Sequence, residues 1–214
     1  MKYPTRPATA ATLAMGLMSI CVLGCALHSP ARGQQPSAGA SAKSAKQYVL
    51  LQTSKGDIKL ELDAERAPAT VKNFVGYVEE GFYAGTIFHR VVQDFMIQGG
   101  GYTKDAPGRE KKTRAPVKNE GGNGLVNDKY TVAMARTSDP NSATSQFFIN
   151  TADNAFLNRK EAADGYGYTV FGRVVEGQDV VDAIAAGATI AEGREKSKPV
   201  DPVVITGAKI VDSK

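Results

Sequence analysis

The sequence has no tryptophan, and its only two cysteines, Cys21 and Cys25, lie in an apolar stretch near the N-terminus. The rest of the chain therefore has no cysteine, which excludes an internal disulfide, a thiolate nucleophile and a cysteine-based metal site there. This absence suits an oxidising compartment, where a free thiol is easily oxidised. Histidine is almost as scarce, because His89 is the only one after residue 46.

Groups for covalent catalysis and for ligand binding are also few. There is no Gly-x-Ser-x-Gly elbow, and no histidines and carboxylates are clustered at metal-ligand spacing. The glycine-rich residues 99–108 lead into a charged loop rather than a helix start, so they do not form a phosphate loop. We therefore expect no metal and no cofactor. We interpret His89 as a structural or surface residue rather than a catalytic base.

A strong excess of one charge is missing as well. The net charge is +4, and Lys2 and Arg6 at the N-terminus contribute two of the positive charges. The basic cluster at residues 108–114 is short and is predicted to be a solvated loop. No stripe of basic residues suggests a nucleic-acid partner, and none is expected.

Residues 1–25 have the pattern of an export signal. Lys2 and Arg6 form a basic start, and residues 7–31 carry no Asp, Glu, Lys or Arg. A transmembrane anchor is the alternative, but the middle of this stretch consists mostly of Ala, Thr and Gly. We therefore predict an exported, periplasmic protein.

The end of the signal, "VLGC", resembles the lipobox of bacterial lipoproteins, which would make Cys25 a lipidation site and tether the protein to a membrane. Leu23 is bulkier than the residue usual at that place, and ordinary cleavage after Ala26 or Ala31 stays open as the alternative. Residues 26–46 are rich in Ala, Ser, Gly, Pro and Gln, and they are predicted to be a flexible linker.

Residues 47–214 are predicted to form one domain. Two apolar-rich runs around Ser54–Gly56 indicate a β-hairpin. A helix follows, with an apolar stripe at Val71, Phe74, Val75 and Val78, Thr70 as its cap and Gly81 as its end. Further strands are predicted at residues 86–92, 95–100, 130–136, 145–150, 168–175 and 202–211, a second helix at residues 177–187, and a long loop at residues 99–128.

About eight strands and two helices within this domain do not follow a βαβ alternation. We predict a mainly β fold, a closed antiparallel barrel capped by two helices. Because side chains alternate along a strand, Phe88 and Arg90 should share one face of their strand. Met96 and Gln98 should share one face of the strand at residues 95–100. Gln146 and Phe148 should share one face of the strand at residues 145–150. This pattern fits either an ordinary barrel with polar residues outside or a pocket with an apolar floor, one cation and amide donors.

Two segments carry a resemblance to a known family. "FHRVVQDFMIQGG" and "MARTSDPNSATSQFFIN" are similar to the cyclophilin family of peptidyl-prolyl cis–trans isomerases, and the resemblance runs from about Gln47 to Val211. It is strongest to bacterial periplasmic members. The resemblance implies an eight-stranded barrel with two capping helices and an active site on the outside of the barrel.

The resemblance also implies roles for single residues. Arg90 matches the catalytic arginine of the family. The substrate-binding positions are the proline pocket Phe95, Met96, Phe148 and Leu157, the glutamines Gln98 and Gln146, and the substrate-pairing strand at Ala135 and Arg136. Phe156 and Tyr168 stand at the pocket edge, where eukaryotic members usually have tryptophan and histidine. Tight cyclosporin binding is therefore not expected.

The expected function is isomerisation of X–Pro bonds in exported or periplasmic proteins, which assists their folding. The expected partners are proline-containing polypeptides, and the expected form is a monomer. Two alternatives stay open: a cyclophilin-like chaperone or peptide-binding module with incidental catalysis, and an all-β ligand-binding protein.

Overall fold

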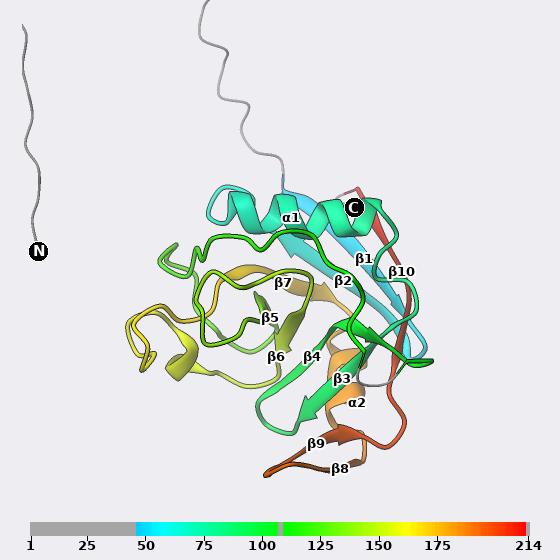
Figure 1. Cartoon of the computed structure of the whole chain (residues 1–214). Coiled ribbons are helices and arrows are strands. Elements are labelled where there is room, and N and C mark those ends of the chain that lie inside the picture. The colour runs from blue at the N-terminus through cyan, green and yellow to red at the C-terminus, as the bar shows by residue number, and fades with distance from the viewer. Residues whose placement is uncertain (1–45, 107–108, 213–214) are drawn as a thin grey trace, which may run out of the picture. The chain divides into compact units, whose positions relative to one another are not determined.

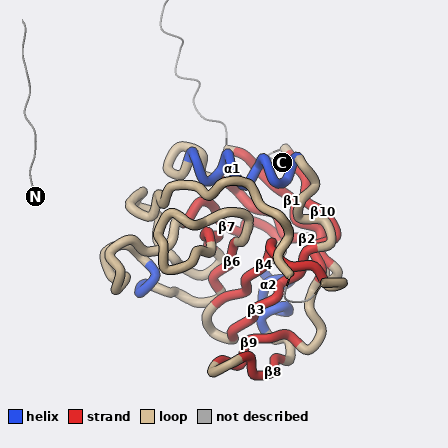
Figure 2. Tube along the Cα trace, in the orientation of Figure 1, coloured by secondary structure: helices blue, strands red, loops and turns tan. Residues whose placement is uncertain are grey.

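The computed structural model describes residues 46–106 and 109–212. The predicted export signal and Cys25 lie outside these residues. Strands predominate (Figure 2). The barrel strands are β1 (Gln47–Thr53), β2 (Gly56–Leu62), β3 (Thr86–Val92), β4 (Met96–Thr103), β5 (Thr131–Met134), β6 (Phe147–Asn150), β7 (Val170–Glu176) and β10 (Val204–Val211). The other elements are the helices α1 (Pro68–Glu79) and α2 (Gln178–Ala185), the short 3-10 helix η1 (Ala155–Leu157), and the strands β8 (Thr189–Glu192) and β9 (Glu195–Pro199).

The eight barrel strands close on themselves in the order β1-β10-β3-β4-β6-β5-β7-β2, and every neighbouring pair is antiparallel. Figure 1 shows α1 across the top of the barrel as drawn and α2 toward its lower end. The closed barrel with two helices confirms the predicted fold class. The first two strands form the predicted hairpin, in which Thr53 pairs with Gly56 across a two-residue turn.

The barrel interior is filled by apolar side chains, and α1 closes one end of it. Phe74 of α1 is fully buried, and its ring lies 5.1 Å from the ring of Tyr83, 5.5 Å from that of Phe147 and 5.1 Å from that of Phe171. A second, smaller apolar cluster lies apart from this core and consists of Met96, Ala133, Phe148, Leu157 and Val170. Neighbouring residues Phe147 and Phe148 therefore belong to different clusters, as the strand alternation predicts.

The prediction that Thr70 caps α1 is wrong. The helix begins two residues earlier, at Pro68, which suits the first helical turn because proline lacks the N–H that would have no partner there. The carboxylate of Glu120 replaces a cap: it accepts hydrogen bonds from the backbone N–H of Ala69 at 3.2 Å and of Thr70 at 2.9 Å. The end of the helix is predicted correctly, since Gly81 follows it with a positive φ of 64°.

The prediction that Phe88 and Arg90 share one face of β3 is also wrong. Phe88 pairs with Gly99 and Arg90 pairs with Gln98, so two steps along β3 oppose one step along β4. The extra residue is His89, which forms a β-bulge. As a result, Phe88 packs in the barrel core, whereas Arg90 faces the outside.

The long loop is shorter at its start than predicted, because β4 continues through the glycines to Thr103. The basic cluster that follows is only partly solvated. The guanidinium of Arg114 lies 4.1 Å from the ring centre of Tyr77 and donates a hydrogen bond to the carbonyl of Asn73. The ammonium of Lys111 lies 4.5 Å from the ring centre of Phe82. These cation–π contacts tie the loop to α1 and the segment after it.

The hairpin of β8 and β9 is another feature that the sequence did not predict. These strands form a separate two-stranded sheet in which Thr189 pairs with Pro199 and Glu192 with Glu195. Figure 1 shows this β8–β9 hairpin at the bottom of the view, below β3 and α2. Its strands carry mainly charged and small side chains, so no apolar alternation indicates them in the sequence.

Candidate active site

A cavity of about 300 Å³ opens on the outer face of the barrel. Its walls come from β3, β4 and β6 and from the segments that follow β5 and precede β7. The cavity is lined by Arg90, Phe95, Met96, Gln98, Ala135, Arg136, Phe148, Phe156, Leu157 and Tyr168. These are all the predicted site residues of the described chain except Gln146.

The floor of the cavity is apolar. Met96, Phe148 and Leu157 are buried and belong to the second apolar cluster, with Phe95 and Tyr168 packed against them. The rings of Phe148 and Tyr168 meet edge to face at 5.6 Å. Such a floor suits a small apolar ring and excludes water from it.

Phe156 forms one edge of the cavity and is 58% exposed. Its ring stacks on that of Phe95, with the ring centres 5.6 Å apart. The Phe156 side chain has no hydrogen-bonding group, so this edge of the cavity offers apolar contact area alone.

Arg90 is one of two arginines that line the cavity, and its guanidinium is held from two sides. Its Nε and Nη2 atoms donate to the two carboxylate oxygens of Glu195, each at 2.7 Å. Its Nη1 atom donates to Oε1 of Gln98 at 3.4 Å and lies 3.8 Å from Sδ of Met96. The bidentate pair therefore leaves the Nη1 end directed at the cavity floor.

Glu195 is the site residue that sequence analysis missed. It lies 105 positions after Arg90, on the unpredicted β8–β9 hairpin. The hydrogen bonds from Arg90 lower the pKa of Glu195 below its usual value, so the carboxylate is charged at neutral pH. No spacing signal connects two such distant residues.

Gln98 and Gln146 form a chain of side-chain amides behind Arg90. Gln98 Nε2 donates to Gln146 Oε1 at 2.9 Å, and Gln146 Nε2 donates to the carboxylate of Glu110 at 2.6 Å. A guanidinium can only donate and a carboxylate can only accept. The two ends of the chain therefore fix the direction of both amides. Gln146 lies behind Gln98 rather than on the cavity wall.

The cavity is also lined by Arg136. Its guanidinium lies 4.4 Å from the ring centre of Tyr168, pairs with the carboxylate of Asp164, and donates from Nε to the carbonyl of Gly167 at 3.1 Å. Backbone N–H groups of Tyr166 and Gly167, together with Arg136, lower the pKa of Asp164 to about 2. All these contacts hold the Arg136 side chain in place.

His89 does not line the cavity, although it precedes Arg90. Its ring packs edge to face on Tyr102, with the ring centres 4.6 Å apart. Burial lowers the pKa of His89 to about 4, so it is neutral at neutral pH. It is poorly placed for proton transfer in the cavity.

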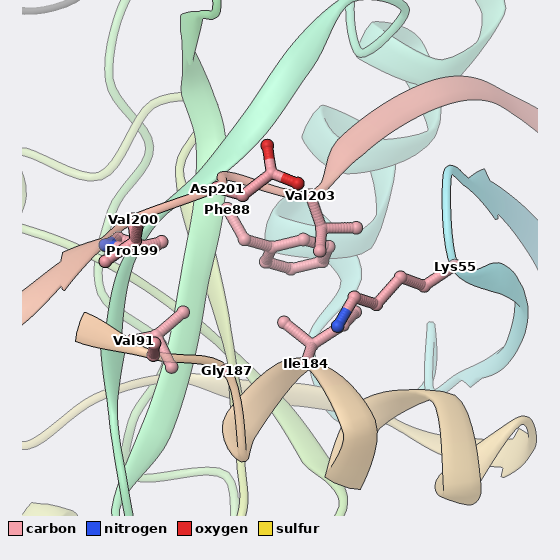
Figure 3. Close-up of a pocket in the computed structure, with 10 residues that line it drawn as sticks. Lys55, Phe88, Val91, Ile184, Gly187, Pro199, Val200, Asp201 and Val203 are labelled. Carbon is pink, nitrogen blue, oxygen red and sulfur yellow. The ribbon is translucent and has the colours of Figure 1, made fainter.

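A second cavity, of about 200 Å³, lies between β3, the end of α2 and the segment after β9. Figure 3 shows the ring of Phe88 and the side chains of Val91, Ile184 and Val203 around it, with Lys55 extending toward Ile184. The ammonium of Lys55 donates to the carbonyl of Ala183.

Among the described residues, no group of three His, Cys, Asp or Glu side chains could hold a metal ion. None of the helices within residues 46–106 and 109–212 is both long enough and apolar enough to cross a membrane.

Comparison with known proteins shows to which family a chain with this barrel and outer cavity belongs. Residues 48–210 match the family model described as "Cyclophilin type peptidyl-prolyl cis-trans isomerase/CLD". The chain belongs to this family and is a peptidyl-prolyl cis–trans isomerase.

Individual relatives agree with this assignment. The peptidyl-prolyl cis–trans isomerase cyp18 of Streptomyces antibioticus is 60% identical over 76% of this chain and 98% of its own length. Peptidyl-prolyl cis–trans isomerase A of Dickeya dadantii is 54% identical over 77% of this chain and 84% of its own length. Among solved structures, a Cryptosporidium parvum cyclophilin-type isomerase crystallised with the dipeptide Ala-Pro is similar, with a TM-score of 0.63 and 27% identity, covering 78% of this chain and all (100%) of that one.

Proposed function

We propose that Arg90 catalyses the isomerisation by donating a hydrogen bond to the prolyl nitrogen as the X–Pro bond twists. The proline ring sits on the floor formed by Met96, Phe148 and Leu157. The observation that carries this proposal is the Nη1 end of Arg90, which lies beside Met96 and Gln98 at the cavity. The cavity and the arginine together suit a reaction in which no covalent bond is made or broken.

The barrier to the reaction is the resonance of the amide, about 18–20 kcal/mol. Uncatalysed exchange of an X–Pro bond takes roughly tens to hundreds of seconds. Shortening this to about a millisecond requires five powers of ten, or about 7 kcal/mol. This amount is within reach of non-covalent stabilisation and needs neither a nucleophile nor a metal.

The stabilisation has to be larger in the transition state than in the planar amide. Twisting the bond removes the conjugation of the prolyl nitrogen, whose lone pair then accepts a hydrogen bond that it cannot accept well when planar. A donor fixed beside that nitrogen therefore binds the transition state selectively. The surrounding apolar groups strengthen the interaction because they exclude water.

The proposed substrates are X–Pro bonds in proteins exported to the periplasm, where the enzyme assists folding. Two sequence features support this location: the signal-like residues 1–25, and the absence of cysteine after Cys25. The Ala-Pro dipeptide with the Cryptosporidium parvum isomerase supports an X–Pro unit as the ligand.

Arg90→Lys distinguishes catalysis from mere binding, because it keeps the charge but loses the planar fork. A hydrogen bond from a charged donor contributes about 1.5–3 kcal/mol, so we expect peptide isomerisation to slow by about tenfold or more. Acceleration of a proline-limited refolding reaction should fall by the same factor. If refolding assistance is unchanged while peptide isomerisation is lost, the protein acts as a peptide-binding module with incidental catalysis.

The mature N-terminus tests the proposed export. Mass spectrometry of protein purified from the producing cells should find residues 1–24 or more removed. An acylated Cys25 would identify a lipid-anchored form, and a free N-terminus beyond residue 25 a soluble one. A chain that still begins at Met1 would contradict export but would leave the isomerase activity unaffected.

A further inference from the structure

The β8–β9 hairpin supplies a charged group to the active site, and the proposed reaction does not use that group directly. Both oxygens of Glu195 accept hydrogen bonds from Arg90. The two side chains are partly shielded from solvent, with Arg90 32% and Glu195 41% exposed. A bidentate pair of this kind is stronger and more directional than an ordinary surface ion pair.

The pattern of the bonds decides what Glu195 can do. A guanidinium carries five N–H hydrogens, one on Nε and two on each Nη atom. Glu195 takes the hydrogen on Nε and one on Nη2, which form one edge of the group. Gln98 takes one hydrogen on Nη1, and the second hydrogen on that atom meets the weak acceptor Sδ of Met96, 3.8 Å away at the cavity floor. Glu195 therefore orients the arginine without occupying the end that faces the substrate.

The hairpin itself is anchored, so the position of Glu195 is defined. In β9, Ser197 and Pro199 are buried, whereas Lys196 and Lys198, which alternate with them, are exposed to solvent. Pro199 and Val91 of β3 line the second cavity together (Figure 3). The neighbouring Ser197 hydroxyl also contributes, after Arg90, to the lowered pKa of Glu195.

We propose that Glu195 is a positioning residue for the isomerase reaction, which holds the plane of the Arg90 guanidinium so that Nη1 addresses the prolyl nitrogen. This inference rests on the proposed catalytic role of Arg90. Without the carboxylate, rotation about the Arg90 side-chain bonds moves the donor away from the cavity. Small displacements of a catalytic group have large effects on rate.

The test is isomerisation of a proline tetrapeptide by the full-length chain with Glu195→Gln. Glutamine keeps the shape but has one acceptor oxygen in place of two, so the bidentate pair is lost. We expect kcat to fall about 10- to 100-fold, with KM nearly unchanged because the apolar floor is intact. Glu195→Asp, which keeps the charge, should recover part of the rate.

Glu192→Gln is the matched control, because it makes the same charge change on the same hairpin at an exposed residue that does not line the cavity. Its rate should equal that of the original protein. Equal losses in the two variants would show a general electrostatic effect of the hairpin and would overturn the proposal. A higher rate in Glu195→Gln would also overturn it, because it would show that Glu195 competes with the substrate for Arg90.

Two further measurements separate this inference from the role of Arg90 itself. The ¹⁵N resonance of Arg90 Nε should show faster hydrogen exchange in Glu195→Gln, and an unchanged resonance would contradict the loss of restraint. In the Arg90→Ala background, Glu195→Gln should have no further effect. If Arg90→Ala is fully active, the catalytic proposal fails. If Arg90→Ala is inactive but Glu195→Gln is fully active, only the positioning role fails.

Discussion

Arg90→Ala is expected to lower kcat/KM for a proline peptide by about 10²- to 10³-fold, the usual cost of removing one donor that stabilises a transition state. The fold should be retained, because Arg90 is on the outer face of the barrel and contributes nothing to its core. Its partner Glu195 is 41% exposed, so it stays hydrated when the arginine is gone. The measurement is a coupled peptide isomerisation assay, with circular dichroism to monitor the fold.

Arg173→Ala is the matched control for this substitution. Arg173 is also on the outside of the barrel, on β7, and it pairs with Glu61 at 3.0 Å. It does not line the active-site cavity, so its loss should leave the rate unchanged. Equal rates for Arg90→Ala and the original protein would refute the proposed mechanism.

The largest expected effect on stability comes from Phe74→Ala. Phe74 is fully buried and contacts three other aromatic rings at the junction of α1 and the barrel. Replacing a buried phenylalanine by alanine removes its transfer free energy and leaves a cavity, which costs about 3–5 kcal/mol. Urea unfolding followed by circular dichroism should show this loss as a lower midpoint with an unchanged slope.

Phe156→Ala is the control, because it is the same substitution at a position that is 58% exposed. Its free energy of unfolding should change by no more than about 0.5 kcal/mol. A loss as large as that of Phe74→Ala would mean that the core at α1 is not the main source of stability.

The barrel and most of the cavity could be predicted because they depend on local patterns. Strand alternation separates Phe147 from Phe148, and family motifs around Arg90 and Gln146 indicate the cavity. The bulge at His89 was not predictable in this way. It changes which side chains share a face of β3, and nothing in the apolar pattern of residues 86–92 marks the extra residue.

The partners of the site residues were the least predictable part. Glu195 reaches Arg90 from the β8–β9 hairpin, and Glu110 reaches Gln146 from the loop after β4. Glu120, which replaces the expected Thr70 cap, is likewise 50 positions from Thr70, whose backbone N–H donates a hydrogen bond to it. Such contacts depend on tertiary structure. They cannot be read from the secondary-structure propensities of residues or from the spacing of residues in the sequence.

The order of strands in the barrel also has a consequence for how the chain acquires its activity during synthesis. β10 lies between β1 and β3, so until the last strand is available both of these strands have an open edge. The turn after β1 meets the start of β10 through a hydrogen bond between residues 150 positions apart, Ser54 and Val204. A ribosome-bound or truncated chain that ends before β10 therefore contains all the residues that line the cavity. It cannot form the closed barrel that holds them in place. The barrel of this isomerase can therefore close only after β10 has been synthesised.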